Sequence, residues 1–204
     1  DENSANPYTL TDDDRTVIGN TTPKFSGGFG LNATFKGFDV SAFFNFMYDF
    51  DVFNANKVMM TTWASNNYNN FSMDISAAKR WRNFDDMGNE IRYSPEILAE
   101  FNKNATMWNP TSIGRPIAMS YAVEDGSFLR LNTATIGYTL PRAWTNKVGL
   151  SRVRFYASGY NLFTITGYSG YDPEVDIATG LTPNIDNNRY PRSRTYTFGV
   201  QLTF

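Results

Sequence analysis

The sequence contains few of the side chains that usually carry out catalysis. It has no histidine and no cysteine, so the commonest general base, the commonest metal ligand and every thiolate site are missing. The best candidates for catalysis are three carboxylates in one loop, because a carboxylate pair can hydrolyse a glycoside without histidine. They are Asp172, Glu174 and Asp176. Acids around a proline in such a loop are more often solvent-facing turn residues, so we expect no enzyme activity, no metal site and no cofactor.

Charge excludes a further class of function. The net charge is -2 and the pI is about 5.2, whereas a nucleic-acid partner would call for a basic patch. The acidic run Asp12-Asp13-Asp14 is not followed by EF-hand spacing. We interpret it as a solvated loop rather than a calcium site.

The elements that position the polar side chains are strands. Residues 194–204 alternate without a slip, with Tyr196, Phe198, Val200, Leu202 and Phe204 on one face and mostly threonine on the other. A period of two predicts a β-strand, and the length matches the roughly 9–11 residues of a tilted membrane strand. No apolar run approaches the roughly 18 residues of a membrane helix. We therefore expect a transmembrane β-barrel strand whose apolar face meets lipid.

Four more segments alternate in the same way, at residues 24–35, 38–50, 128–139 and 152–165. Lys36-Gly37 predicts a tight turn that joins the first two into a hairpin. The fold class is thus all-β: an antiparallel transmembrane barrel, of which this chain supplies about five long strands. A closed bacterial barrel needs an even number of at least eight. We therefore expect a piece of a larger barrel.

The cost of burying charge in lipid indicates which faces turn inward. Arginine on the lipid face near mid-bilayer costs about 2–4 kcal/mol, so Arg130 should face the lumen, and Leu129, Leu131, Thr133 and Thr135 should face lipid. Ile136 and Tyr138 then fall on the lumen face, which either a bulge or the barrel rim would explain. The expected lumen-facing residues are Asp39, Asn45, Arg130, Asn132, Tyr156 and Tyr160.

The connections divide into short turns and long loops. We expect extracellular loops at 1–23, 51–127 and 166–193, hairpins at 24–50 and 128–165, and a closing strand at 194–204. Ser94 and Pro95 predict the start of a short helix, and a second helix is expected near 74–81. Trp63, Trp81 and Trp108 are interpreted as packing anchors of the long loop. The connection 140–151 should contain one helical turn after Pro141.

Several stretches together resemble the SusC/RagA family of TonB-dependent outer-membrane transporters. They include Asp13 to Asn20, Val123 to Leu131, Ile136 to Pro141, Ser158 to Thr164, Gly170 to Glu174 and Tyr190 to Gly199. The match runs nearly end to end, in the order found at the C-terminus of the family, and is loose only between Asn54 and Ser120. The resemblance implies the C-terminal part of a 22-stranded barrel with an N-terminal plug.

The resemblance also implies partners. These are the N-terminal remainder of the transporter, a SusD-like surface lipoprotein, TonB acting through the missing part, glycan or peptide cargo, and lipid with lipopolysaccharide. Tyr196, Phe198, Val200, Leu202 and Phe204 are expected to form the signal for outer-membrane insertion as well as the lipid face. Tyr168, Tyr171 and Asp172 are expected near cargo or the lid protein. Two alternatives stay open at this point: a soluble carbohydrate-binding β-sandwich, and a passive porin.

Overall fold

The computed structural model describes residues 15–63, 70–111, 117–175 and 184–204. Two compact units result. The first comprises the described parts of Asp1–Val52, Val123–Glu174 and Tyr190–Phe204, and the second those of Phe53–Ala122 and Val175–Arg189. Among the described helices, none combines the length and the apolar character that crossing a membrane requires.

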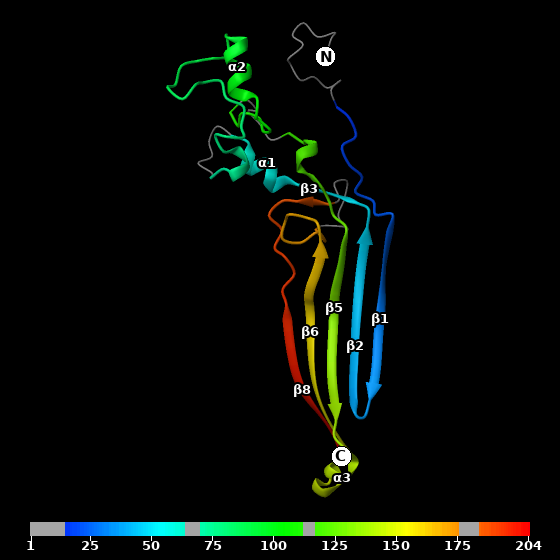
Figure 1. Ribbon diagram of the computed structural model, residues 1–204. Helices are drawn as coiled ribbons and strands as arrows, with labels where there is room; N and C mark the ends of the chain where they lie inside the picture. The colour runs from blue at the N-terminus through cyan, green and yellow to red at the C-terminus, as the bar shows by residue number, and fades with distance from the viewer. Residues whose placement is uncertain (1–14, 64–69, 112–116, 176–183) are drawn as a thin grey trace. The chain divides into compact units, whose positions relative to one another are not determined.

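The first unit is built around one antiparallel sheet of five strands in the order β1-β2-β5-β6-β8 (Figure 1). The strands are β1 (Phe25–Phe35), β2 (Phe38–Tyr48), β5 (Phe128–Thr139), β6 (Arg152–Thr166) and β8 (Thr195–Thr203), and the short strand β4 (Val123–Asp125) precedes β5. The five alternating segments are therefore confirmed as strands. Lys36 and Gly37 form the predicted tight turn with φ of 45° and 89°, the left-handed pair of a type I′ hairpin.

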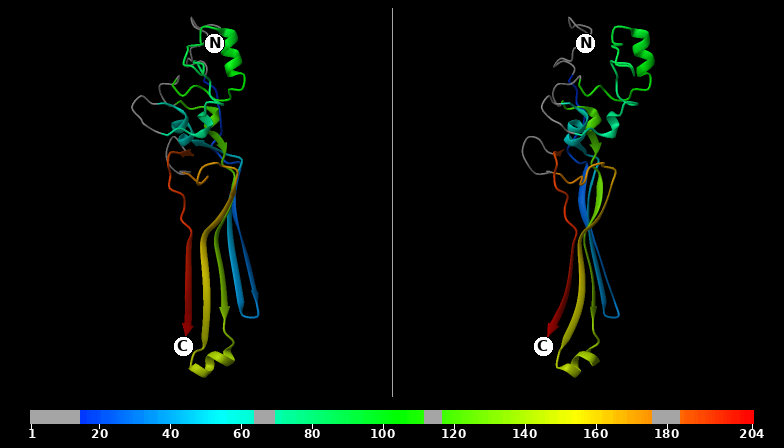
Figure 2. Two further views of the ribbon diagram at one scale, coloured as in Figure 1. Left: turned by 60° about the vertical axis from the view of Figure 1, so that its left-hand side comes forward. Right: turned by 90° about the vertical axis from the view of Figure 1, so that its left-hand side faces the viewer.

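The ladder register assigns every side chain to one of two faces, because residues directly opposite each other in a sheet share a face. One face, called the apolar face here, carries these side chains in strand order: Phe25, Phe29, Leu31, Ala33, Phe35, Phe38, Val40, Ala42, Phe44, Phe46, Leu129, Leu131, Ala134, Ile136, Tyr138, Val153, Phe155, Ala157, Phe163, Ile165, Tyr196, Phe198, Val200 and Leu202. The other, the polar face, carries most of the charged, amide and hydroxyl side chains, together with Phe43, Met47 and Phe128. The edge-on view in Figure 2 shows the sheet as a single twisted layer.

A bulge in β5 corrects the predicted facing of its second half. Asn132 has no partner in either ladder, and opposite it Asn161 and Leu162 of β6 are also unpaired. An extra residue reverses the alternation. Thr133 and Thr135 therefore lie on the polar face, where Thr135 shares a 2.8 Å hydroxyl hydrogen bond with Ser158. The expectation that these two threonines face lipid was wrong, and of the two explanations left open for Ile136 and Tyr138 the bulge is correct.

The connection between β5 and β6 contains α3 (Arg142–Thr145) and a 3₁₀ turn, η4 (Asn146–Val148). This confirms the helical turn expected after Pro141. Its end is tied to the sheet by a backbone hydrogen bond of 2.9 Å from Leu140 to Val153. In Figure 1 this connection and the β1–β2 turn lie at the same end of the sheet.

The second unit consists of short elements. β3 (Asp51–Asn54) leads into α1 (Ala55–Thr61), and Phe53 and Asn54 pair in parallel with β7 (Ile185–Asp186). The remaining elements are two 3₁₀ turns, η2 (Met73–Ile75) and η3 (Ser120–Ala122), and the helix α2 (Pro95–Asn102). The short helix predicted at Pro95 is thus confirmed, although the Ser94 side chain makes no capping hydrogen bond. β3 and α1 were not foreseen.

The prediction of a helix near 74–81 was wrong. Only η2 forms there, because the backbone beyond it makes hydrogen bonds with a distant segment of the chain instead of within a helix. The carbonyl of Lys79 accepts hydrogen bonds from the amides of Thr106 and Met107, and Trp81 donates to the carbonyl of Met107. Two of the three tryptophans do act as packing anchors. Trp108 meets Tyr121 edge to face at 5.2 Å and donates from Nε1 to the Thr61 carbonyl, while Trp63 lies 5.9 Å from Phe71.

Candidate functional site

The polar face of the sheet is the candidate functional site, and its first feature is an ion pair between β2 and β6. Arg154 Nε donates to Asp39 Oδ1 at 2.9 Å, and Nη2 of the same guanidinium donates to Asp39 Oδ2. The guanidinium reaches across Gly137 of β5, where an added Cβ would stand 2.7 Å from Asp39 Oδ1. The absence of a side chain at Gly137 therefore allows the bidentate contact. Both charged groups lie close to the sheet backbone as a result.

Aromatic rings on the polar face are laid over glycines of the neighbouring strand. The Tyr156 ring covers Gly199 of β8, where an added Cβ would stand 2.6 Å from Cε1. The Phe43 ring similarly covers Gly28 of β1, with a corresponding distance of 2.8 Å to Cζ. These large side chains thus lie parallel to the sheet instead of projecting from it. The polar face is therefore shallow and mostly polar.

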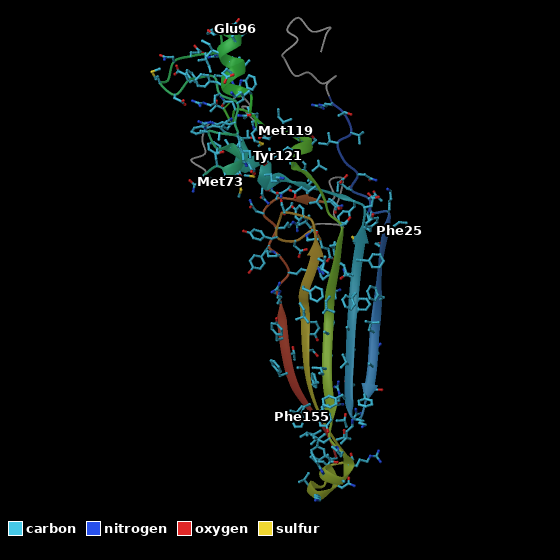
Figure 3. All side chains as sticks on the ribbon, in the orientation of Figure 1. Phe25, Met73, Glu96, Met119, Tyr121 and Phe155 are labelled. Atoms are coloured by element: carbon cyan, nitrogen blue, oxygen red, sulfur yellow. The ribbon has the colours of Figure 1, made fainter. Side chains whose placement is uncertain are left out.

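The second feature lies at the other end of this face. It is called the Arg130 cluster and consists of the buried or largely buried Arg130, Asp172 and Glu174 with the exposed Arg192. Arg130 Nη2 donates to Asp172 Oδ1, and Arg192 Nη2 donates to Glu174 Oε1 at 2.7 Å. The side chain of Arg130 is only 2% exposed. The cluster joins β5, the loop after β6 and the approach to β8. Figure 3 shows the side chains of the sheet on the ribbon.

Local turn chemistry places Asp172 in this cluster. Pro173 favours a turn, in which the amide of Glu174 donates to Asp172 Oδ1 at 3.0 Å. The second oxygen, Oδ2, accepts from the amide of Arg192 at 3.3 Å. Burial tends to raise the pKa of Asp172, but the hydrogen bond from Arg130 and those from the two amides prevail, so its pKa lies below the ordinary value.

Two buried polar atoms of the cluster have no hydrogen-bond partner among the residues that the structure describes. Arg130 Nε and Glu174 Oε2 lie 3.7 Å apart, close enough for attraction between charges but beyond hydrogen-bond length. Asn45, directly opposite Arg130 in the ladder, also has a buried and unpartnered side-chain oxygen, as does Asn132 in the bulge. The polar face therefore keeps unused hydrogen-bonding capacity between the Arg130 cluster and the bulge.

This arrangement does not fit catalysis by a carboxylate pair. A general acid needs a raised pKa, whereas that of Asp172 is lowered. Asp172 and Glu174 are also occupied by arginines, and Asp176 lies outside the described residues. The interpretation of Asp172 and Glu174 as solvent-facing turn residues was nevertheless wrong, since both carboxylates are largely buried. Within the described ranges, no group of three acidic residues could hold a metal ion.

The structure brings together most of the predicted lumen residues. Asp39, Asn45, Arg130, Tyr156 and Tyr160 all lie on the polar face, while Asn132 lies in the bulge. The three predicted loop residues differ in exposure: Tyr168 and Asp172 are buried, whereas Tyr171 is 87% exposed. Tyr196, Phe198, Val200 and Leu202 share the apolar face of β8, and Phe204, just beyond the strand, is 90% exposed.

Sequence reasoning missed several residues of this site. The pairing of Arg154 with Asp39 joins positions 115 residues apart, and that of Arg192 with Glu174 joins two loop residues. A clue was available for Arg154, because its position in the alternation of β6 already placed a second arginine on the polar face. For Gly137 and Gly199 the signal was their place on the polar face of strands otherwise rich in large residues.

Comparison with known proteins agrees with this architecture. No family model matches the sequence. The chain is 32% identical, over 94% of its length, to TonB-dependent receptor P3 of Formosa agariphila, and 32% identical, over 74% of its length, to TonB-dependent receptor SusC of Bacteroides thetaiotaomicron. It spans less than a fifth of these relatives, 17% and 15% of their lengths.

Solved structures give the same result for the fold. The RagAB peptide importer in its closed-closed state matches 96% of this chain with a TM-score of 0.71 and 25% identity, and the chain covers 19% of that structure. A second structure of the RagAB peptide transporter gives a TM-score of 0.70 at 26% identity. The chain is therefore a segment homologous to the TonB-dependent receptors of the SusC/RagA family.

Proposed function

We propose that this chain forms part of the wall of an outer-membrane β-barrel that imports oligosaccharides or oligopeptides with energy supplied through TonB. The observation that carries the proposal is the division of one sheet into two unlike faces. Its apolar face is continuous across five strands and includes exposed large side chains such as Phe29, Leu31, Ile136 and Phe198. A soluble protein would bury such a face. In a barrel it meets lipid.

The placement of charge supports the same orientation. All three arginines of the five strands, Arg130, Arg152 and Arg154, point away from the apolar face. Near the middle of a bilayer, each would cost about 2–4 kcal/mol if turned toward lipid. β1 and β2 each have 11 residues, enough for a tilted strand to cross. The polar face then lines the lumen.

The sheet also bears on the two alternatives. A β-sandwich requires a second sheet packed on the first, and no second sheet packs on either face within the described part of the first unit. A passive porin has the same kind of wall, so only energy coupling distinguishes a porin from an active importer. The relatives are called TonB-dependent receptors, which supports active import.

The proposal extends to partners and cargo. We place a SusD-like lipoprotein over the extracellular side, and a plug together with the TonB-contacting segment in the remainder of the transporter. RagAB is described as a peptide importer, so peptide is one candidate cargo for this protein and glycan is the other. Of the three loop residues predicted to lie near cargo or the lid, Tyr171 is the one exposed enough to contact either. Asp172 positions that loop by binding Arg130.

Uptake by cells that make the complete protein tests the proposal. Labelled oligopeptides and oligosaccharides are supplied to cells with and without the gene, and each strain is compared with one that lacks TonB. Active import predicts uptake of one cargo class that is lost when either gene is absent. Uptake that survives loss of TonB would favour the passive porin. Tyr171→Ala should weaken uptake without changing the amount of protein in the membrane.

A further inference from the structure

A hollow lies on the apolar face of the sheet, over β5, β6 and β8. Its volume is about 560 Å³. Its floor is the small side chain of Ala157, which lies between Ile136 of β5 and Phe198 of β8 in the ladder. These two larger side chains are 52% and 79% exposed, so they project on either side of the floor. The sequence thus leaves a gap in an otherwise bulky face, called the Ala157 hollow here.

Aromatic side chains border the Ala157 hollow toward the end of the sheet with the short connections. In the next row of the apolar face, Phe155 lies between Tyr138 of β5 and Val200 of β8. Phe38 lies beside Tyr138, with the ring centroids 4.5 Å apart. Figure 3 labels Phe155 near this end of the sheet. No charged residue is among the described residues that line the hollow, so its occupant must be apolar.

The surroundings of the hollow favour a lipid chain over a protein segment. A protein interface has a polar rim around its apolar core, whereas the apolar face continues beyond the hollow, for example at Val40 of β2 and Leu202 of β8. Further strands of a barrel pair with the edge strands β1 and β8, so they extend the layer instead of covering its face. The hollow exceeds the roughly 150 Å³ that suffices for benzene in an apolar cavity. It therefore has room for several methylene groups.

We propose that the Ala157 hollow seats one acyl chain of a phospholipid from the periplasmic leaflet. Phe38 begins β2 directly after the tight turn, and short barrel turns lie on the periplasmic side, so the chain comes from that leaflet rather than from lipopolysaccharide. Lipid chains are as apolar as leucine, so hydrophobicity alone does not favour this place. The gain comes from carbon contacts with the floor and sides of the hollow. The inference rests on the proposed membrane location.

Photolabelling of the complete protein in phospholipid bilayers tests the inference. The probe is a phosphatidylethanolamine that carries a light-activated group on one acyl chain, and mass spectrometry identifies the labelled peptides. In the wild type, peptides that contain Ile136, Ala157 and Phe198 should take up more label than the peptide with Phe29 and Leu31. The last two side chains are exposed on the same face in β1, outside the hollow.

The substitution Ala157→Leu separates the hollow from the rest of the face, because the larger side chain fills the hollow. A lipid chain that loses several carbon contacts should give label at Ile136 and Phe198 that is lower by about threefold or more. Ala42→Leu is the matched control, since it adds the same side chain to the same face in β2, outside the hollow. It should leave the label at Ile136 and Phe198 unchanged. Heat-modifiability on gels verifies that both variants are folded.

The outcomes separate this inference from the proposed function. Equal labelling of the hollow and of the β1 peptide in the wild type would overturn the inference, as would a loss with Ala42→Leu as large as that with Ala157→Leu. Displacement of the label by added lipopolysaccharide would also overturn it, because the chain would then come from the outer leaflet. If no peptide of the apolar face took up label, the proposed membrane location would fail and the inference with it.

Discussion

Replacing Asp172 by asparagine tests whether the Arg130 cluster holds the loop after β6 in place. The change keeps the shape of the side chain and removes its charge. Arg130 is 2% exposed and has one unpartnered nitrogen already, so it would be left as a buried cation with weakened pairing. Breaking a buried pair by removing one partner costs about 3–5 kcal/mol. We expect that cost to appear as local opening of the loop, because the cluster joins three chain segments there.

Hydrogen exchange of the complete protein in detergent measures this opening. A cost of about 3–5 kcal/mol corresponds to faster exchange by about two to four orders of magnitude in the segment 168–175. Asp49→Asn is the matched control, because Asp49 pairs with Lys24 while both side chains are about half exposed. Such surface pairs contribute about 0–1 kcal/mol. Equal protection of the loop in the Asp172→Asn and Asp49→Asn proteins would refute the reasoning.

The same cluster gives a dependence on pH. The pKa of Asp172 is lowered in the folded loop, so its contribution to stability is fully present above the pKa of the unfolded chain. It is lost as the pH falls through the lower, folded value. Protection of the segment 168–175 should therefore persist through mildly acidic pH and decline only below the ordinary aspartate range. Loss of protection between pH 7 and 5 would contradict this assignment.

Five further substitutions test the faces of the sheet. Val200→Arg should destabilise the folded barrel by about 2–4 kcal/mol, whereas Gln201→Arg on the polar face should not, as heat-modifiability on gels would show. Phe204→Ala should lower the amount of transporter in the outer membrane, because the insertion signal depends on the aromatic ring. It should leave the heat-modifiability of the inserted protein unchanged, since near the interface even a charged substitution costs only about 0–1 kcal/mol. Gly199→Ala should disturb the Tyr156 ring and lower the unfolding temperature. In a protein that already carries Tyr156→Ala, the Gly199→Ala substitution should not lower the unfolding temperature further.

The sequence predicted strands well because alternation is a local signal that extends over many residues. Residues 128–139 were expected as a strand and form β5 with the same bounds. The bulge at Asn132 could not be foreseen, because inserting one residue leaves each half of the strand in perfect alternation. Its only trace was the apparent change of face at Ile136, which the sequence left with two explanations.

Long-range contacts limited what could be predicted of the site. The loop around Asp172 has the composition of an exposed turn, and its burial depends on Arg130, 42 residues earlier. The expected helix over 74–81 failed for a similar reason, because the backbone of Lys79 pairs with residues near Met107. In both cases a distant partner overrode a correct local preference. No local pattern reports such a partner.

The bulge at Asn132 has a consequence for how this wall can change in evolution. It interrupts the two-residue phase of β5, whereas β6 keeps its odd-numbered residues on the apolar face from Val153 to Ile165. A single-residue insertion or deletion elsewhere in a strand would turn every later side chain to the wrong face. At this level the phase is already interrupted, so length changes have a place where they can be absorbed. The two halves of the wall can thus diverge separately, one adapting its loops while the other keeps its fit to the membrane.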